Sequence, residues 1–284
     1  MKSVLVRVQE YRTQAHGAEI ALINYFLEHP DETAKLSIHV LSEKSYTSPA
    51  TIIRFCKKLG FRGYKEFIVS LNYELALRSS KNKDIGEEIN KGDSLEDIVD
   101  KVTYRNIQAL EDTRKLVDLD EMQRCIDVLV AAKTVGLFGI GSSLLAAKDM
   151  YLKFLRLNKP CICCDDLHLQ IIYAKNLTSM DAAVIFSYSG LTQEIISSAK
   201  LLKNQNVPVI TITRFAENEL TRMSDYKLYV SANELLVRTA ATASRISQLN
   251  MIDILFSAYV NQNHDRNMNI LKGNVIEKNK NNTD

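Results

Sequence analysis

Residues 184–200, VIFSYSGLTQEIISSAK, change character in the middle. An apolar run ends at Ser187, the short residues Ser189, Gly190 and Thr192 follow, and apolar positions then recur at helical spacing. A short apolar run that ends in turn residues is typical of a buried strand, whereas the later spacing predicts a helix. The stretch therefore predicts a strand that passes through a hydroxyl-rich turn directly into a helix.

The same alternation of strand and helix continues through the second part of the chain. Apolar runs predict strands at 134–140, 160–166, 181–189, 207–213 and 226–232. Amphipathic segments predict helices at 142–158, 167–176, 191–203 and 242–262. Strands that are separated by helices in this way form a mainly parallel sheet flanked by helices.

The first part of the chain has no β-rich run. Helical spacing predicts helices at 18–30, where Pro30 ends the pattern, and at 36–45, 48–60 and 63–80. A polar stretch follows, and Ser94 with Asp97 three residues later is a helix-start signature. The predicted fold class is multidomain: an all-α N-terminal domain at 1–79, a linker and connecting helix at 80–115, an α/β domain at 116–265 and a polar tail at 266–284.

Two of the N-terminal helices flank the sequence KSYTS, residues 44–48, in a helix-turn-helix pattern. Ser48 is suited to cap the second helix, and Pro49 is suited to its first position. The apolar residues of that helix share one face, which predicts that they pack inward. The positions on or near the opposite face are Ala50, Thr51, Arg54, Lys57 and Lys58. Small or polar residues and an arginine at the start of a recognition helix can read bases in the major groove.

Local charge favours DNA binding by this helix. The segment from Lys44 to Lys65 contains six basic residues and no acidic residue. Neutralisation of DNA phosphates requires such a local excess. A solvated basic face on a helical bundle is the alternative explanation of the charge. The turn, the cap and the inward apolar face together favour DNA binding.

Residues 36–67, LSIHVLSEKSYTSPATIIRFCKKLGFRGYKEF, resemble the N-terminal domain of the RpiR (MurR/RpiR) transcriptional regulators. The part that begins at Arg54 is especially specific to them. The resemblance implies that Gly60 and Gly63 shape the turn after the recognition helix. It also implies that the basic and aromatic residues that follow approach the DNA backbone, namely Arg62, Tyr64 and Lys65.

Two hydroxyl-rich turns follow predicted strands in the second part of the chain. The first contains Gly139, Gly141, Ser142 and Ser143, and the second contains Ser187, Ser189, Gly190 and Thr192. Ligands of open α/β sheets bind beyond the carboxyl ends of the strands, where a helix N-terminus attracts anions. Leu144 stands where a dinucleotide motif needs its third glycine, and the Walker A lysine is missing. Helix capping alone explains one such turn, whereas two turns separated by a strand and a helix predict a phosphate pocket.

The two turns resemble the GxGSS and SxSGxT segments of the sugar isomerase (SIS) domain, and residues 238–256 resemble its final helix in RpiR regulators. The resemblance then covers residues of about 16 to 262. It implies that a sugar phosphate is bound by Ser142, Ser143, Ser187, Ser189, Gly190 and Thr192. It also implies that His168 lies near the sugar, and a helix-capping or half-buried histidine is the alternative.

The composition and the five cysteines limit the other possibilities. An odd number of cysteines and no secretory signal favour free thiols and a cytoplasmic location. A metal site is one interpretation of the cluster formed by Cys161, Cys163 and Cys164, with His168 nearby. A buried strand explains the cluster better, because cysteine is among the most commonly buried residues. We expect no metal or cofactor. The net charge of +2 identifies no partner, and no apolar run approaches the roughly 20 residues that cross a bilayer.

Enzyme and sensor remain as alternatives for the predicted SIS domain. A phosphosugar isomerase needs a general base near the sugar, for which Glu194 or His168 is the candidate. An acid at the position of Glu194 also stabilises a helix start. The DNA-binding domain favours a sensor that is not an enzyme: a regulator, by resemblance a repressor, of carbohydrate or amino-sugar metabolism genes. Its expected partners are operator DNA, a sugar phosphate and further copies of the chain, in a homodimer or homotetramer formed through the SIS domain.

Overall fold

A computed structural model describes residues 3–78, 89–232 and 241–275. The chain divides into two compact units. The first unit consists of Met1–Val117, Thr213–Asn218 and Tyr229–Ser247, and the second of Asp118–Ile212, Glu219–Leu228 and Gln248–Asp284. The last residue of the predicted N-terminal domain, 79, the first part of the predicted linker, 80–88, and the last part of the predicted tail, 276–284, lie outside the described residues. In the part of the chain that is described, no helix combines the length and apolar character needed to cross a membrane.

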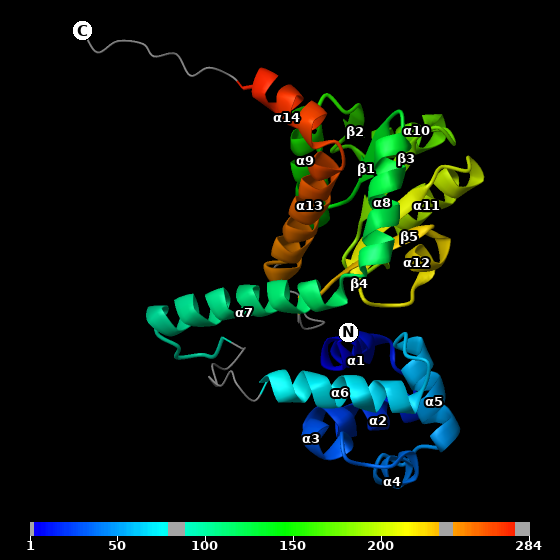
Figure 1. Ribbon diagram of the computed structural model, residues 1–284, viewed down its shortest axis with the longest axis vertical. Helices are drawn as coiled ribbons and strands as arrows, with labels where there is room; N and C mark the ends of the chain where they lie inside the picture. The colour runs from blue at the N-terminus through cyan, green and yellow to red at the C-terminus, as the bar shows by residue number, and fades with distance from the viewer. Residues whose placement is uncertain (1–2, 79–88, 233–240, 276–284) are drawn as a thin grey trace. The chain divides into compact units, whose positions relative to one another are not determined.

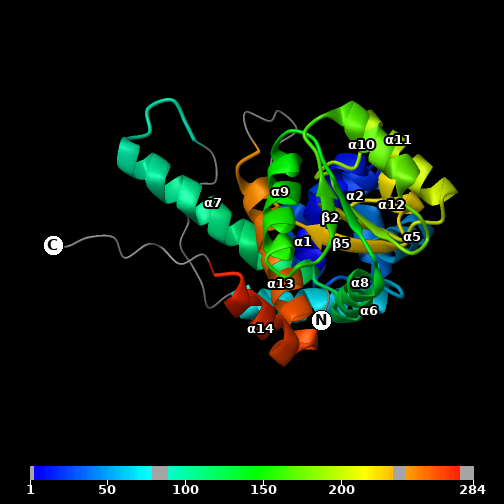
Figure 2. The same ribbon diagram turned by 90° about the horizontal axis from the view of Figure 1, so that it is seen from above.

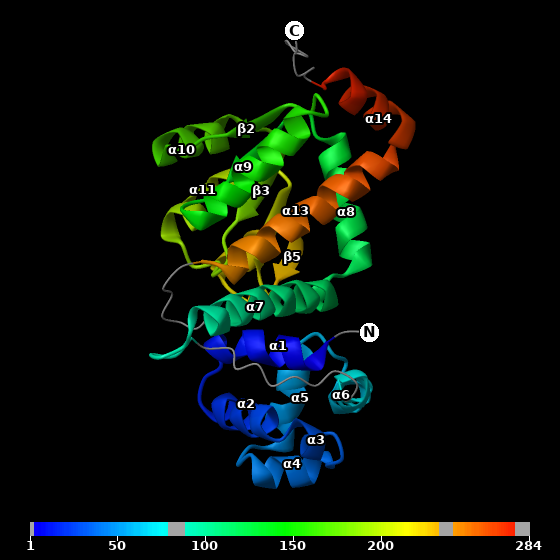
Figure 3. The ribbon, with the colours of Figure 1, turned by 90° about the vertical axis from the view of Figure 1, so that its left-hand side faces the viewer.

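The first unit begins with a cluster of helices, coloured blue to cyan in Figure 3. These elements are α1 (Val4–Tyr11), the 3₁₀ turn η1 (Arg12–Gln14), α2 (Ala18–Glu28), α3 (Pro30–Thr33), α4 (Ile38–Lys44), α5 (Pro49–Lys58) and α6 (Tyr64–Arg78). The four helices predicted for this region are present as α2, α4, α5 and α6. Their core contains closely packed rings, with the centroid of Phe67 5.4 Å from that of Phe26 and 6.3 Å from that of Phe55.

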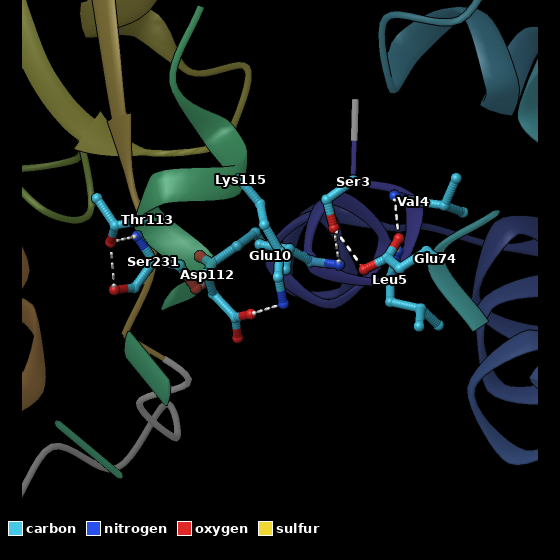
Figure 4. Close-up of polar contacts among 10 residues, drawn as sticks. Ser3, Val4, Leu5, Glu10, Glu74, Asp112, Thr113, Lys115 and Ser231 are labelled. Carbon is cyan, nitrogen blue, oxygen red and sulfur yellow. Dashed lines mark hydrogen bonds and ion pairs between the residues drawn. The ribbon is translucent and has the colours of Figure 1, made fainter. Parts of the chain in front are cut away.

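Helix α1 is not predicted by the sequence patterns, because its segment VLVRVQEY is rich in valine, which lowers helix propensity. Glu74 of α6 stabilises its start (Figure 4). The Glu74 carboxylate accepts hydrogen bonds from the Ser3 hydroxyl at 2.7 Å and from the backbone N–H groups of Val4 at 2.7 Å and Leu5 at 3.1 Å. These N–H groups have no partner within the helix. A residue 70 positions away therefore satisfies the start of α1.

The predicted connecting helix is α7 (Leu95–Leu116), and it begins at the predicted signature. The Ser94 hydroxyl accepts a hydrogen bond from the Asp97 N–H at 3.1 Å, and the Asp97 carboxylate accepts one from the Ser94 N–H at 2.9 Å. This reciprocal pair is a capping box, which satisfies two backbone donors at once. The predicted start of the connecting helix is therefore confirmed.

The α/β part of the chain contains all five predicted strands. They are β1 (Val135–Phe138), β2 (Cys161–Cys163), β3 (Ala182–Phe186), β4 (Val209–Arg214) and β5 (Tyr226–Val230). Their order in the sheet is β2-β1-β3-β4-β5, and the pairs β1–β2, β1–β3 and β3–β4 are parallel. The central strands β1 and β3 are buried along their whole length.

Helices cover both faces of this sheet. They are α8 (Leu119–Ala131), α9 (Ser142–Leu155), α10 (Leu167–Asn176), α11 (Gln193–Asn204), α12 (Glu219–Met223), α13 (Ala243–Gln262) and α14 (His264–Gly273). The steps from β1 to β2 and from β3 to β4 run in opposite directions, so right-handed crossovers place α9 and α11 on opposite faces. Figures 1 and 2 show α9 and α13 on one face, and α10, α11 and α12 on the other. The predicted fold class is confirmed.

Helix α14 occupies part of the segment that the sequence predicts as a polar tail. The Asn267 side chain donates hydrogen bonds to the carbonyls of Tyr259 at 3.1 Å and Val260 at 3.2 Å. The Asn274 side chain donates to the Arg156 carbonyl at 2.9 Å. Polar side-chain contacts hold this helix to its neighbours, and polar composition alone does not predict them.

Candidate DNA-binding and ligand-binding sites

The turn between α4 and α5 leads into α5 with the cap and the first helical residue that the sequence predicts. The Ser48 hydroxyl caps this helix by accepting a hydrogen bond from the Thr51 N–H at 3.2 Å, and Pro49 is the first helical residue. Ile52, Phe55 and Cys56 are buried on the inner face. The predicted cap and inward face of this helix are therefore present.

Polar side chains line the outer side of the first turns of α5. An Arg54 guanidinium nitrogen donates to the Thr51 hydroxyl at 3.1 Å, and the Thr51 and Ser48 hydroxyls lie 3.0 Å apart. Ala50 and Lys57 are exposed beside them. The geometry gives Arg54 a defined position on an exposed helix face, from which a guanidinium can reach the edge of a guanine.

Two of the predicted DNA-contacting residues also have partners inside the domain. The Lys58 ammonium forms an ion pair with Glu19 at 2.7 Å. The Tyr64 hydroxyl donates to the Leu36 carbonyl at 3.0 Å, and burial raises the pKa of Tyr64 to about 12. Both side chains therefore contribute to the structure of the helical domain.

The turn after α5 has a backbone conformation that favours glycine. Gly60 has a φ of +80°, and its N–H donates to the Lys57 carbonyl at 2.9 Å, while the Phe61 N–H donates to the Cys56 carbonyl at 3.0 Å. This pair of bonds is a Schellman motif, which favours glycine in the left-handed conformation. A side chain at Gly63 would meet open space instead. Arg62 and Lys65 are exposed and line a surface hollow of about 460 Å³ with Gly63, Glu66 and Val69.

The two hydroxyl-rich turns of the second unit meet at one edge of the sheet. The first turn follows β1 and the second follows β3, and these strands are parallel neighbours. Their next neighbours, β2 and β4, lie on opposite sides, so the chain reverses its winding between β1 and β3. Ligands of such sheets bind at this reversal, beyond the carboxyl ends of the strands. The structure thus brings together the two turns that the sequence predicts as a phosphate pocket.

Neither helix at this edge is capped by a side chain. The N-cap residue of α9 is Gly141, with a φ of +60°, and that of α11 is Thr192, whose hydroxyl makes no capping bond. By contrast, Asp118 and Asp166 cap α8 and α10 with their carboxylates. Ordinary capping, the alternative that the sequence leaves open, therefore does not explain Thr192.

Two buried glutamines position the first turn, and the sequence patterns do not identify them. Gln170, 2% exposed, accepts from the Gly139 N–H at 3.3 Å and donates to the carbonyls of Gly139 at 3.0 Å and Cys164 at 2.9 Å. Gln248, 1% exposed, donates to the Ser143 hydroxyl at 3.3 Å. A glutamine on the inward face of an amphipathic helix is the signal that could have found them.

The remaining hydroxyls of the edge differ in exposure. Ser187 and Ser143 are buried, whereas Ser142, Ser189 and Thr192 are partly exposed. The Ser189 hydroxyl accepts a hydrogen bond from the Leu191 N–H at 3.2 Å. Gly190, with a φ of +67°, lets the chain turn sharply between Ser189 and α11.

The two candidate general bases are both exposed. His168 lies in the first turn of α10, where Asp166 supplies the cap, so His168 is neither a cap nor half-buried. Glu194 lies in the first turn of α11, where a negative charge stabilises the helix start. Neither carboxylate nor imidazole is held inside a closed cavity at these positions.

Cys161 and Cys163 lie in the edge strand β2, as the buried-strand interpretation predicts, and Cys164 directly follows it, although all three are only partly buried. Burial raises the pKa of Cys161 to about 12 and that of Cys163 to about 11, so both thiols are protonated at neutral pH. Among the residues that the structure describes, no group of three or more His, Cys, Asp or Glu side chains could hold a metal ion.

A buried polar contact joins α1, α7 and the start of α13 at Ser231, and Figure 4 shows Glu10, Thr113 and Ser231. The Ser231 hydroxyl donates to the Glu10 carboxylate of α1 at 2.7 Å. The Ser231 N–H donates to the Thr113 hydroxyl of α7 at 3.0 Å, and its carbonyl accepts from the Ser247 hydroxyl of α13 at 2.6 Å. Burial raises the pKa of Glu10, and the bond from Ser231 opposes this shift.

Comparison with known proteins identifies both parts of the chain. Residues 2–78 match the model of the helix-turn-helix domain of the rpiR family, and residues 128–258 match the SIS domain. A protein of Caldanaerobacter subterraneus, described as an uncharacterized HTH-type transcriptional regulator, is 33% identical over 256 residues, which are 90% of each chain. The HTH-type transcriptional regulator HexR of Escherichia coli is 27% identical over 257 residues, 90% of this chain and 88% of HexR.

A solved structure shares the fold over almost the whole chain. The Vibrio vulnificus NanR protein, in complex with ManNAc-6P, has a TM-score of 0.60 and 24% identity, and the match covers 95% of this chain and 96% of NanR. Together with the two domain matches, the relative that is 33% identical over 90% of each chain settles the family. The chain belongs to the rpiR family of helix-turn-helix transcriptional regulators that carry an SIS domain.

Proposed function

We propose that this regulator binds operator DNA through α5 and senses a sugar phosphate at the edge of the sheet where β1 and β3 end. In this proposal it represses genes of carbohydrate or amino-sugar metabolism. The ligand is released unchanged, so the SIS domain acts as a sensor and not as an enzyme. Copies of the chain associate through the SIS domain as a homodimer or homotetramer, which lets recognition helices meet half-sites that are related by symmetry.

The uncapped starts of α9 and α11 carry the ligand part of the proposal. The first N–H groups of a helix have no intrahelical partner, and they carry a partial positive charge that attracts anions. At Gly141 and Thr192 no side-chain capping bond uses these groups. Each helix end contributes about 0.3–2 kcal/mol, so useful affinity requires both helix starts and the serine and threonine hydroxyls beside them.

This chemistry and a solved structure with the same fold support the proposed class of ligand. Short hydroxyl donors and two helix starts suit a phosphate group, and NanR is described in complex with ManNAc-6P. We therefore expect a phosphorylated sugar to bind with its phosphate between Ser142, Ser189 and Thr192. His168 is exposed in the first turn of α10, the helix that follows the neighbouring strand β2, and we expect it to reach the sugar ring.

Thermal unfolding tests the ligand part. The full-length chain is heated alone and with ManNAc-6P, glucosamine 6-phosphate or inorganic phosphate. We expect at least one sugar phosphate to raise the midpoint more than inorganic phosphate does, because the sugar adds contacts to those of the phosphate. No shift with any phosphate would contradict the pocket. The same sugar phosphates, incubated with the protein, are expected to show no aldose–ketose interconversion, and turnover that Glu194→Gln abolishes would favour the isomerase.

Binding to DNA duplexes tests the other part. The operator is selected from a random duplex library, and affinity is then measured for the selected and for unrelated duplexes. Arg54→Ala is expected to weaken binding to the selected duplex more than to unrelated DNA, because it removes a base contact worth about 1–3 kcal/mol. Lys133→Ala, at an exposed position of the second unit, removes one positive charge as a matched control. An equal loss on both duplexes would remove the base-reading role from Arg54.

A further inference from the structure

Tyr46 combines a strained backbone with an exposed side chain in the turn before the recognition helix. Its φ is +52°, and its side chain is 92% exposed. In the described part of the chain, the other non-glycine residues with positive φ are Asn158 and Asn206. Asparagine tolerates this left-handed region because its short side chain can hydrogen-bond locally, whereas a bulky residue is rarely found there. The position of Tyr46 is thus unfavourable for the backbone, and its ring is almost wholly in water.

Hydrogen bonds of the neighbouring residues hold the turn in this conformation. The Ser42 hydroxyl donates to the Thr47 carbonyl at 2.5 Å, and the Thr47 N–H donates to the Ser42 carbonyl at 3.0 Å. The Ser45 hydroxyl, which is buried, donates to the Leu41 carbonyl at 2.6 Å and lies 2.8 Å from the Thr47 hydroxyl. Strained residues persist where the surrounding structure determines them in this way, and they concentrate at functional sites.

The surroundings of Tyr46 indicate what its side chain meets. Tyr46 lies two residues before Ser48, the cap of α5, and within the segment from Lys44 to Lys65 that has six basic and no acidic residues. When a recognition helix enters the major groove, the first helix of the motif crosses the sugar-phosphate backbone. Tyr46 lies in the turn that joins these two helices, α4 and α5. Tyrosine hydroxyls are among the donors that bind phosphate oxygens.

We infer that Tyr46 is a DNA-backbone contact whose hydroxyl donates to a phosphate oxygen and so sets the register of α5 on the operator. This inference rests on the proposed binding of DNA by α5. The strained turn holds the ring outward at the start of the helix, where a glycine would relieve the strain but remove the contact. A residue of this kind favours binding of DNA at the expense of the stability of the free domain.

Three variants of the full-length chain separate the ring, the hydroxyl and the strain. Tyr46→Phe keeps the ring and the strain, Tyr46→Ala keeps the strain alone, and Tyr46→Gly removes both the side chain and the strain. We expect Tyr46→Phe and Tyr46→Ala to weaken binding about tenfold, because a hydrogen bond to a charged group is lost. The loss is expected to be equal on the selected duplex and on unrelated duplexes. The salt dependence of binding stays unchanged, because tyrosine carries no charge that releases counterions.

Thermal unfolding of the same variants gives the second readout. Tyr46→Gly is expected to keep or raise the unfolding midpoint while it binds DNA at least as weakly as Tyr46→Ala. Tyr73→Phe, at an exposed tyrosine of α6, serves as the matched control and is expected to change neither quantity.

Four outcomes would overturn the inference. Unchanged affinity in Tyr46→Ala removes the side chain from the interface, and unchanged affinity in Tyr46→Phe alone removes the hydroxyl. A lowered midpoint in Tyr46→Gly makes the residue a structural support, and an altered oligomeric state of Tyr46→Ala without DNA assigns the ring to a protein contact. If the wild-type protein binds no duplex, or if Arg54→Ala leaves the operator preference intact, the proposed DNA site itself fails, and this result is distinct from each of the four.

Discussion

Two regions of the molecule differ in whether a serine or threonine hydroxyl caps the helix that follows. In the turn before α5, Ser45 and Ser48 bond to the backbone of their own segment. At the edge of the sheet, the Thr192 hydroxyl does not cap α11, and no side chain caps α9. The hydroxyl bonds of the first region shape the turn and cap its helix, whereas the starts of α9 and α11 have no side-chain cap. The same residue types thus cap a helix in one region and leave two helix starts uncapped in the other, where we propose that the ligand binds.

The largest effect on stability is expected from Gln170, whose side chain holds the first hydroxyl-rich turn, after β1, by hydrogen bonds to Gly139. Gln170→Leu removes three hydrogen bonds, to Gly139 and Cys164, and leaves buried backbone groups without partners. We expect the free energy of unfolding to fall by about 3 kcal/mol. Chemical denaturation measures this change, and Gln205→Leu at an exposed position provides the control. A loss no larger than that of the control would show that the turn is held by other contacts.

The turn before α5 is expected to depend on its hydroxyls. Ser48→Ala removes the cap of α5, and Ser45→Ala removes a buried bond to the Leu41 carbonyl. Together they are expected to lower the free energy of unfolding by about 2 kcal/mol, since a cap and a buried hydrogen bond each contribute about 1 kcal/mol. Equilibrium denaturation in urea checks the value. An unaltered free energy of unfolding would show that these hydroxyls do not stabilise the turn, and it would contradict the contrast with the sheet edge.

Ser231 is a third case, because its hydroxyl donates a hydrogen bond to the buried carboxylate of Glu10. Burial raises the pKa of Glu10 above its ordinary value of 4.5. The unfolded chain therefore releases this proton at a lower pH than the folded chain does, and the contribution of Glu10 to stability is lost as the pH rises from about 4.5 through the raised pKa. The stability of the wild type relative to Glu10→Gln is expected to decrease across this range. Glu43→Gln, at an exposed glutamate, is expected to show no such trend.

The elements that sequence predicts best are those with local signals. The strands end in turn residues, α5 has Ser48 and Pro49 at its start, and α7 begins at the Ser94–Asp97 capping box. Each signal lies within a few residues of the feature that it predicts. The hydroxyl-rich turns were found in the same way, and parallel strand order then brought them together.

The features that sequence patterns miss depend on distant partners. Helix α1 has a valine-rich segment of low helix propensity, and Glu74 of α6 satisfies its first N–H groups. Gln170 and Gln248 reach the first turn of the site from other helices, and a glutamine in a helix gives no local sign of such a contact. The strained φ of Tyr46 is likewise set by hydrogen bonds of its turn and not by its own preference.

The smallest effect on stability is expected at the second hydroxyl-rich turn, after β3. Substitutions there give the most direct test of the proposed ligand site. Ser189→Ala combined with Thr192→Ala is expected to change the free energy of unfolding of the ligand-free protein by less than about 0.5 kcal/mol, as for surface substitutions. For the wild type, a bound sugar phosphate at 100 times its Kd adds about 2.7 kcal/mol. In the double variant this addition is expected to disappear, while affinity for the operator in the absence of ligand stays unchanged. A double variant that unfolds more easily without ligand, or that is still stabilised by the sugar phosphate, would contradict the assignment of these hydroxyls to the ligand.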